Sequence, residues 1–146
     1  MTKLITALCL AACLALAAPA TAAVQTFGPD FSKFTIDVPD GWKTQPQEGG
    51  CQLISPDQKS SFSVQVQKNG GKSAAELAKL IGNQVGGKIL STKDLNPTQT
   101  IMEIELDGVK LKIMVMVDGD KFCAATMAGP DEDTMIKIMD TIKDAK

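Results

Sequence analysis

The sequence predicts an α+β fold: an α/β/α sandwich in which a central antiparallel sheet, built of hairpins and a C-terminal meander, carries helices on both faces. Three observations favour it. Several segments alternate apolar and polar residues, as half-buried strands do. Apolar residues recur at helical spacing in 77–85 and again in 135–142. Residues 113–117 are apolar throughout, which indicates a strand packed on both sides.

The first element, residues 1–23, is predicted to be a signal peptide that is removed on export. It has a positively charged start, an apolar run over residues 4–18, and small residues that suit cleavage after Ala22 or Ala23. The run is too short to span a bilayer, which takes about 20 residues. We therefore expect one domain over residues 24–146, with no transmembrane segment.

A lipid anchor is the alternative form of export. Leu10-Ala11-Ala12-Cys13 has the order of residues found in a bacterial lipoprotein signal. Lipidation of Cys13 would tether the protein to a membrane. Only a short hydrophobic region would then remain before the cysteine, so soluble export to the periplasm or the medium is the preferred interpretation.

The first strands of the mature chain are expected at 34–38, 51–55 and 60–67. In FTIDVPDGW the apolar residues alternate with polar ones up to a Pro-Asp-Gly turn. The next two segments are joined by PDQK, and in the second the apolar residues again occupy every other position. These two segments are therefore predicted to form a hairpin.

A helix is expected over residues 73–85. Ser73 followed by Glu76 makes a capping box, an apolar stripe follows, and a Gly-Gly pair ends the helix. A weaker strand is expected over residues 88–95, closed by Asn-Pro.

Two Asp-Gly turns in residues 100–127 predict a register for the meander. Taking Asp107-Gly108 as a two-residue type I′ turn pairs Leu106 with Val109, Glu105 with Lys110, Ile104 with Leu111, Glu103 with Lys112 and Ile101 with Met114. Taking Asp118-Gly119 in the same way pairs Val115 with Phe122, Met114 with Cys123, Ile113 with Ala124 and Lys112 with Ala125. The first register brings opposite charges together twice, which stabilises cross-strand pairs.

This register gives the meander one fully apolar face and one mixed face. The apolar face comprises Met102, Ile104, Leu106, Val109, Leu111, Ile113, Val115, Phe122 and Ala124. The mixed face carries Glu103, Glu105, Lys110 and Lys112 at one end and Ile101, Met114, Met116 and Cys123 at the other. A last helix over about 131–143, with Met135, Ile138, Met139 and Ile142 on one side, is expected to cover the apolar end of the mixed face.

Charge and composition exclude one class of partner. The formal net charge is −2, there is no His, and loss of Lys3 with the signal peptide would leave −3. The mature chain therefore lacks the basic face that nucleic-acid binding requires.

Two of the four cysteines, Cys51 and Cys123, remain in the mature chain. In an oxidising compartment such a pair could form a disulfide. Two buried free thiols are the alternative, and both interpretations stay open from sequence. The spacing excludes a Cys-x-x-Cys redox motif.

A cluster of sulfur side chains raises the question of a metal. Met114, Met116, Cys123 and Met127 could hold copper(I), which prefers thiolate and thioether ligands. Methionine is also a common filler where a helix meets a sheet, and no His assists. Core packing is the preferred interpretation, so we predict no metal ligand and no cofactor.

Three other motifs are better explained structurally. NGGKS would need a glycine at position 66 to complete a phosphate loop, but Val66 stands there, so Ser73 is interpreted as a helix cap. Asp118-Gly119-Asp120 lacks the oxygen ligands of a calcium loop and is interpreted as a turn. The acids at 131–133 suit a helix N-terminus.

The inventory for catalysis is thin. The chain has no His or Tyr, so most nucleophile–base pairs lack a partner. A carboxylate pair or a Ser-Lys pair using Ser60, Ser61 or Ser63 is conceivable, but no spacing selects one. We therefore predict no catalytic residues and no enzyme activity.

Five segments, FTIDVPDGW, LISPDQKSSFSVQV, SAAELAKLI, LDGVKLKIMVMVDGDKF and IKIMDTIK, together resemble PsbP-like and DcrB-like proteins. The resemblance spans about Phe31 to Ile142. It implies an α/β/α sandwich and a non-enzymatic role. Plant members are extrinsic subunits of photosystem II that help retain its inorganic ions, bacterial relatives are envelope proteins or lipoproteins, and a nuclear-import factor that binds the GTPase Ran shares the fold. Metal roles in some relatives involve histidine, which this chain lacks.

The leading hypothesis is an exported, non-catalytic binding or accessory protein of the bacterial envelope that contacts a protein partner or a small ligand. A small copper carrier using the Met/Cys face is the second hypothesis. A hydrolase is the third, and it requires a solvent-open pocket with paired carboxylates or a Ser-Lys pair.

Overall fold

The computed structural model describes residues 23–146. The predicted signal peptide, except Ala23, and the lipid-anchor residue Cys13 lie outside the described residues. In chain order the elements are β1 (Ala23–Phe27), β2 (Phe34–Val38), β3 (Lys43–Gln47), β4 (Gly50–Ile54), β5 (Ser61–Lys68), α2 (Ala74–Val85), β6 (Lys88–Asn96), β7 (Gln99–Leu106), β8 (Val109–Asp118), β9 (Lys121–Ala128), α3 (Glu132–Asp140) and β10 (Lys143–Asp144).

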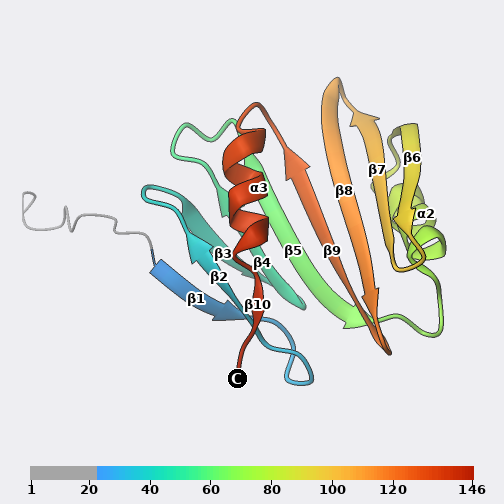
Figure 1. Cartoon of the computed structure of the whole chain (residues 1–146). Coiled ribbons are helices and arrows are strands. Elements are labelled where there is room, and N and C mark those ends of the chain that lie inside the picture. Colours follow the sequence, from blue (N-terminus) through green and yellow to red (C-terminus); the bar gives the residue numbers. More distant parts are fainter. Residues whose placement is uncertain (1–22) are drawn as a thin grey trace, which may run out of the picture.

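These strands form two antiparallel sheets. The larger has seven strands in the order β3-β4-β5-β9-β8-β7-β6, and the smaller has three in the order β1-β2-β10. In Figure 1 the small sheet and α3 lie in front of the large sheet, whereas α2 lies behind β6 and β7. The predicted α+β class is confirmed. The small sheet is a difference from the prediction, because β2 was expected in the central sheet.

Helices α2 and α3 cover opposite faces of the large sheet. Alternation along β9 shows this: Phe122 packs in the core under α2, whereas Ala125 and Met127 pack in the core under α3. The α2 core consists of Ala74, Leu77, Ala78, Met102, Ile104, Ile113, Val115 and Phe122, and the α3 core of Phe34, Ile36, Val38, Cys51, Leu53, Phe62, Val64, Val66, Ala125, Met127, Met135 and Ile138.

The β7–β8 hairpin has the predicted register. Leu106 pairs with Val109 and Ile101 with Met114. Asp107 and Gly108 have φ of 52° and 78°, and positive φ at both central residues defines a type I′ turn. The face predicted to be apolar is the one that packs against α2, although Val109 at the turn is 49% exposed.

The predicted register of the β8–β9 hairpin is wrong by two residues. Asp118 pairs with Lys121, so the turn is Gly119-Asp120 and Val115 lies opposite Ala124. Gly119 has φ of 61° and stands at the first central position, where a type II′ turn requires glycine. A shift of two residues changes partners but leaves every side chain on its predicted face.

Helix α2 begins and ends as predicted. The Ser73 hydroxyl accepts from the Glu76 amide while the Glu76 carboxylate accepts from the Ser73 amide, and Gly86 caps the other end with φ of 76°. These hydrogen bonds hold the pKa of Glu76 below its usual range.

Helix α3 is shorter than predicted. Thr141 ends it, donating its hydroxyl to the Ile138 carbonyl at 2.7 Å and accepting the Asp37 amide of β2 at 2.9 Å. Lys143 then pairs with Thr35 as part of β10. The predicted last turn is thus replaced by a strand, because β2 offers a free edge.

The predicted cover of the sulfur residues is only partly right. Met135 and Ile138 of α3 share one core with Met127, and Cys123 packs at the border of this core. Met114 and Met116 on β8 remain half-buried. Helix α3 and β2 occupy the face of the large sheet over β4, β5 and β9, so β8 extends beyond their edge.

Candidate functional site: an apolar groove beside α3

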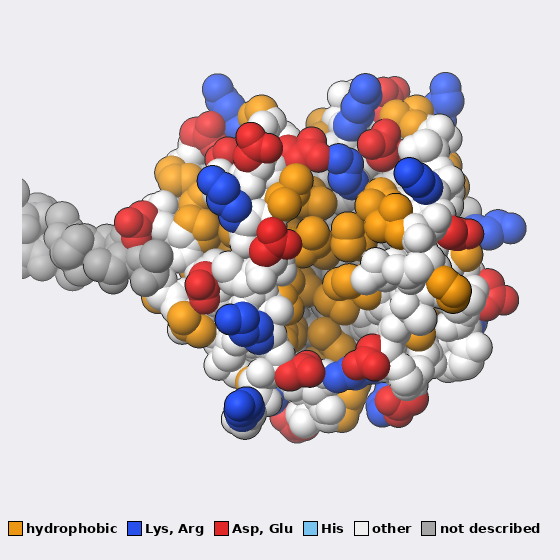
Figure 2. Space-filling view, viewed as in Figure 1, with side chains coloured by type: hydrophobic (Ala, Val, Ile, Leu, Met, Phe, Trp, Pro, Cys, Tyr) orange, Lys and Arg blue, Asp and Glu red, His pale blue; other side chains and the backbone are white. Residues whose placement is uncertain are grey.

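A groove runs beside α3 on the face of β9, β8 and β7 that α3 leaves open. Figure 2 shows it as a hollow floored by hydrophobic side chains, with charged side chains along its margins. Two cavities of about 360 and 310 Å³ occupy its two ends. Met116 and Cys123 line the first cavity, and Met127 and Met135 line the second.

The sheet register explains why the floor is apolar. The row that crosses the groove between the two cavities consists of Ala125, Met114 and Ile101 on adjacent strands. The next row consists of Cys123, Met116 and Gln99. The backbone N–H and C=O groups of β8 already pair with β7 and β9. The floor therefore presents side chains, most of them apolar, and no free strand edge.

One end of the groove is bounded by an ion pair between the sheet and α3. The ammonium of Lys112 on β8 pairs with the Glu132 carboxylate in the first turn of α3. Glu103 and Lys110 line the same cavity. We call this the Lys112 end.

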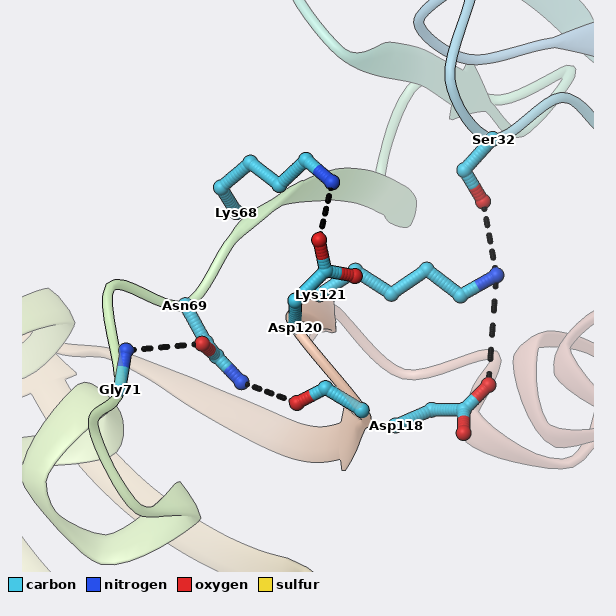
Figure 3. A network of polar contacts seen from close by, with 8 residues as sticks. Ser32, Lys68, Asn69, Gly71, Asp118, Asp120 and Lys121 are labelled. Carbon is cyan, nitrogen blue, oxygen red and sulfur yellow. Dashed lines mark hydrogen bonds and ion pairs between the residues drawn. The ribbon is translucent and has the colours of Figure 1, made fainter.

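The opposite end is organised by Lys121. Its ammonium donates to the Ser32 hydroxyl at 3.0 Å and lies 4.0 Å from the Asp118 carboxylate and 3.8 Å from that of Asp144. Figure 3 shows the Lys121 side chain extended between Ser32 and Asp118. Its side chain is 26% exposed, whereas both aspartates are exposed by more than 80%. We call this the Lys121 end.

The β8–β9 turn at the Lys121 end is tied to the β5–α2 loop. Asn69, which is buried, donates its side-chain amide to the Gly119 carbonyl at 2.7 Å and accepts the Gly71 amide at 2.9 Å (Figure 3). Lys68 pairs with Asp120 and holds the pKa of that carboxyl below its usual range. The turn that precedes Lys121 is therefore held in place by two consecutive residues at the end of β5.

Of the two alternatives left open for Cys51 and Cys123, the structure has the free thiols and not the disulfide. Cys51 on β4 lies opposite Val64, and Cys123 on β9 lies opposite Val66, so strand β5 separates them. Two strand spacings are about 9.5 Å, and disulfide-linked Cα atoms lie within about 7 Å.

Burial keeps both thiols protonated. It raises the pKa of Cys51 to about 12 and that of Cys123 to about 11. Removal from water disfavours the thiolate, which is the reactive and metal-binding form.

The sulfur residues are brought partly together. Met116 lies directly opposite Cys123 across β8 and β9, and Met114 points to the same face two residues along. Met127 instead packs in the α3 core. Within residues 23–146 no three His, Cys, Asp or Glu side chains are grouped as metal ligands.

The other candidate residues lie where the structural interpretation expected them. Ser73 caps α2, Gly119-Asp120 is a turn, and residues 131–133 begin α3. The hydroxyl of the buried Ser60 accepts the Asp131 amide. The sequence analysis missed the pair formed by Ser32 and Lys121, because 89 residues separate them and only the stacking of the two sheets brings them together.

Among residues 23–146 no helix has the length and apolar character needed to cross a membrane.

Comparison with known proteins supports the fold. No family model and no curated protein matches the chain. The solution structure of cyanobacterial PsbP (CyanoP) from Synechocystis sp. PCC 6803 is similar, with a TM-score of 0.59 and 9% identity over 85% of this chain and 94% of that one. The chain has a PsbP-like fold. The predicted resemblance is thereby confirmed for the PsbP-like fold, whereas the DcrB-like likeness stays a prediction.

This PsbP-like chain is also similar to a protein of Bacteroides thetaiotaomicron. The TM-score is 0.50 at 14% identity, and the match covers 77% of this chain but only 45% of that protein. Identities this low describe a shared fold, and function has to be argued from the groove.

Proposed function

We propose that this PsbP-like protein is an exported, non-catalytic binding module of the bacterial cell envelope, and that the groove beside α3 is its binding site. The observation that carries the proposal is the open floor formed by Ile101, Met114 and Met116. These residues lie on a hydrogen-bonded sheet, yet within residues 23–146 neither α2, nor α3, nor the small sheet covers them. An apolar surface left open beside a packed core is typical of an interaction site.

Two further features support this role. The groove is lined mainly by apolar side chains with polar groups at its ends, as ligand sites usually are. Its methionines have flexible, polarisable side chains that adapt to different apolar shapes. The signal peptide predicted over residues 1–23 supports export.

Site-specific photocrosslinking tests the proposal. A photoreactive phenylalanine analogue replaces Met116 in the groove or, as a matched control, Leu80, which is 44% exposed on α2 on the opposite face. After irradiation of whole cells we expect adducts at position 116 and few at position 80. Equal labelling at the two positions would remove the groove as the binding site.

Export has its own measurement. The intact mass of protein recovered from the envelope or medium should correspond to cleavage after Ala22 or Ala23. An added lipid on Cys13 would instead support the alternative anchor. Retention of the full chain in the cytoplasm would contradict export.

A copper(I) carrier is a second candidate, favoured by the direct cross-strand pair of Met116 and Cys123. The raised pKa of Cys123, about 11, weighs against it because copper binding requires loss of the thiol proton. Elemental analysis of protein purified without chelators distinguishes the two: copper at one equivalent, lost in Met116→Leu, would support the carrier.

A hydrolase is the third candidate, and the Ser32–Lys121 contact is the Ser-Lys pair that it requires. A lysine that takes a proton from serine has to be neutral, whereas Lys121 lies 4.0 and 3.8 Å from the carboxylates of Asp118 and Asp144, an arrangement usual for a structural ion pair. Labelling by a fluorophosphonate probe, lost in Ser32→Ala, would support a hydrolase over a binding module.

A further inference from the structure

We propose that the groove binds one long-chain fatty acid, with its hydrocarbon chain on the Met114–Met116 floor and its carboxylate at Lys121 and Ser32. This inference rests on the proposed function and names the ligand class for the same site.

The length of the groove suits a single chain. The stretch of β8 from Lys112 to Asp118 spans about 20 Å at about 3.4 Å per residue. An extended chain of about 16 carbons has nearly the same length, because each carbon–carbon bond of about 1.5 Å advances the chain by somewhat less. The Lys112–Glu132 ion pair bounds the far end.

The floor favours hydrocarbon over peptide. A strand cannot pair there, since the floor is a sheet face whose backbone groups are already bonded to neighbouring strands. An α-helix is about 10 Å across and would occupy about 1,500 Å³ over the same length. The two cavities hold about 360 and 310 Å³, which leaves room for a narrow flexible ligand.

The Lys121 end offers donors for an anion. Of the three N–H groups of the ammonium, only the one bonded to Ser32 has a hydrogen-bond acceptor among residues 23–146, because Asp118 and Asp144 lie at 4.0 and 3.8 Å. Those two ion pairs involve highly exposed carboxylates, and such pairs are weak. The Ser32 hydroxyl can also turn to donate. A carboxylate that arrives from the groove thus meets two donors where the apolar floor begins, and it competes for Lys121 with the exposed carboxylates of Asp118 and Asp144.

Binding of palmitate and hexadecanol to the purified protein tests the inference. Both ligands fill the floor, but only palmitate carries the carboxylate. We expect one palmitate per protein, with Lys121→Gln weakening palmitate about tenfold, as loss of a charged hydrogen bond does, and leaving hexadecanol unchanged. Retained hexadecanol binding also shows that the variant is folded. Lys79→Gln, at an exposed position of α2, is the matched control and should change the affinity for neither palmitate nor hexadecanol.

The floor is tested separately. Met116→Gln puts a polar amide into the groove and should weaken both ligands, whereas Leu80→Gln on the opposite face should weaken neither. Hexanoate, which is too short to span the groove, should bind at least 100-fold more weakly than palmitate, since it buries far fewer methylene groups on the floor.

Several results would overturn the inference. These are no palmitate binding below its aggregation threshold, equal palmitate affinity in Lys121→Gln, or a concentration-dependent dimer in which the groove is occluded. Transfer of the protein to phosphatidylglycerol vesicles without uptake of free palmitate would assign the groove to membrane lipid instead. If position 116 crosslinks only to a protein while palmitate fails to bind, the fatty-acid inference fails and the binding module stands.

Discussion

Gly129 lies where two backbone segments approach so closely that a side chain would not fit. It follows β9 with φ of 100°, and a Cβ there would lie 2.1 Å from the Lys59 carbonyl oxygen. We expect Gly129→Ala to lower the free energy of unfolding by about 3 kcal/mol or more, because it adds backbone strain to a clash with backbone that cannot move freely. Urea unfolding measures the change.

Gly108 is the matched control for that substitution. Its φ of 78° is also positive, but a Cβ there would have no atom within 4 Å. Gly108→Ala should therefore cost only about 1 kcal/mol, from the left-handed backbone alone. Equal losses in the two variants would mean that the contact with Lys59 contributes nothing.

The buried thiol of Cys51 should make the protein less stable in alkali. Its pKa is raised in the folded state from 9.0 to about 12, so folding stabilises the protonated form. That contribution is complete below pH 9 and is lost as the pH rises through the folded value. We expect the free energy of unfolding to fall more steeply between pH 9 and 11 in the wild type than in Cys51→Val, as measured by urea unfolding at each pH.

A labelling experiment accompanies that pH series. Iodoacetamide added to the unfolded, unreduced protein should modify both Cys51 and Cys123. In the folded protein it should modify Cys51 more slowly than it does in the unfolded protein. Protection of both cysteines after unfolding would indicate the disulfide that the strand order excludes.

Residue-level features were predictable where the chain determines them locally. The Ser73 cap and the Asp107-Gly108 turn depend on neighbours within four residues, and both were found. The separation of Cys51 from Cys123 and the contact of Ser32 with Lys121 depend on which strands lie side by side. Nothing in the local sequence states that β5 lies between β4 and β9.

At the scale of elements, the start of α2 gives a test of local stabilisation. Replacing Ser73 by Ala removes the hydroxyl that accepts from Glu76 and should cost about 1 kcal/mol. Ser91, on the exposed edge strand β6, is the control, and Ser91→Ala should change the free energy of unfolding by less than about 0.5 kcal/mol. A loss in Ser73→Ala no larger than the control would contradict the role of the cap.

Shortening side chains on the two faces of β8 should lower the free energy of unfolding by different amounts. Ile113 is fully buried against α2, so Ile113→Ala should cost about 3 kcal/mol. Met114 lies half-buried on the groove floor, so Met114→Ala should cost about 1 kcal/mol or less. Thermal or urea unfolding of both variants makes the comparison, and similar losses would show that the groove floor is covered in solution.

Apolar and polar alternation predicted which side chains of β7, β8 and β9 share a face. Side chains alternate between the two faces every residue, so a turn misplaced by two residues does not change these faces. It did not predict β1, β3 or β10. These strands are short and mostly exposed, so their sequences carry little apolar alternation. The open groove depends on these unpredicted strands. Strand β2 joins β1 and β10 in a second sheet, and this sheet and α3 together cover the large sheet only as far as β9.

At the scale of the whole molecule, the two cores share one sheet and should unfold together. Trp42, the single tryptophan, packs against the α3 core, whereas Ile104 lies in the α2 core. We expect Ile104→Ala to lower the urea midpoint followed by Trp42 fluorescence as much as the midpoint followed by circular dichroism. Coincident transitions are the sign of two-state unfolding.

Leu53→Ala, in the α3 core, is the companion variant and should shift both signals in the same way. Two separate transitions in either variant would mean that the halves of the sheet melt independently.

The pairing of β2 with β10 has a consequence for folding kinetics. The hydrogen bond from Thr35 to Lys143 joins residues 108 positions apart, so a chain synthesised only as far as β9 has no partner for that edge of β2 and no α3 over its core. Such distant contacts form slowly. Under the proposed export, late closure of this kind would keep the chain unfolded while it crosses a translocation channel, and the protein would become compact only when its last residues arrive.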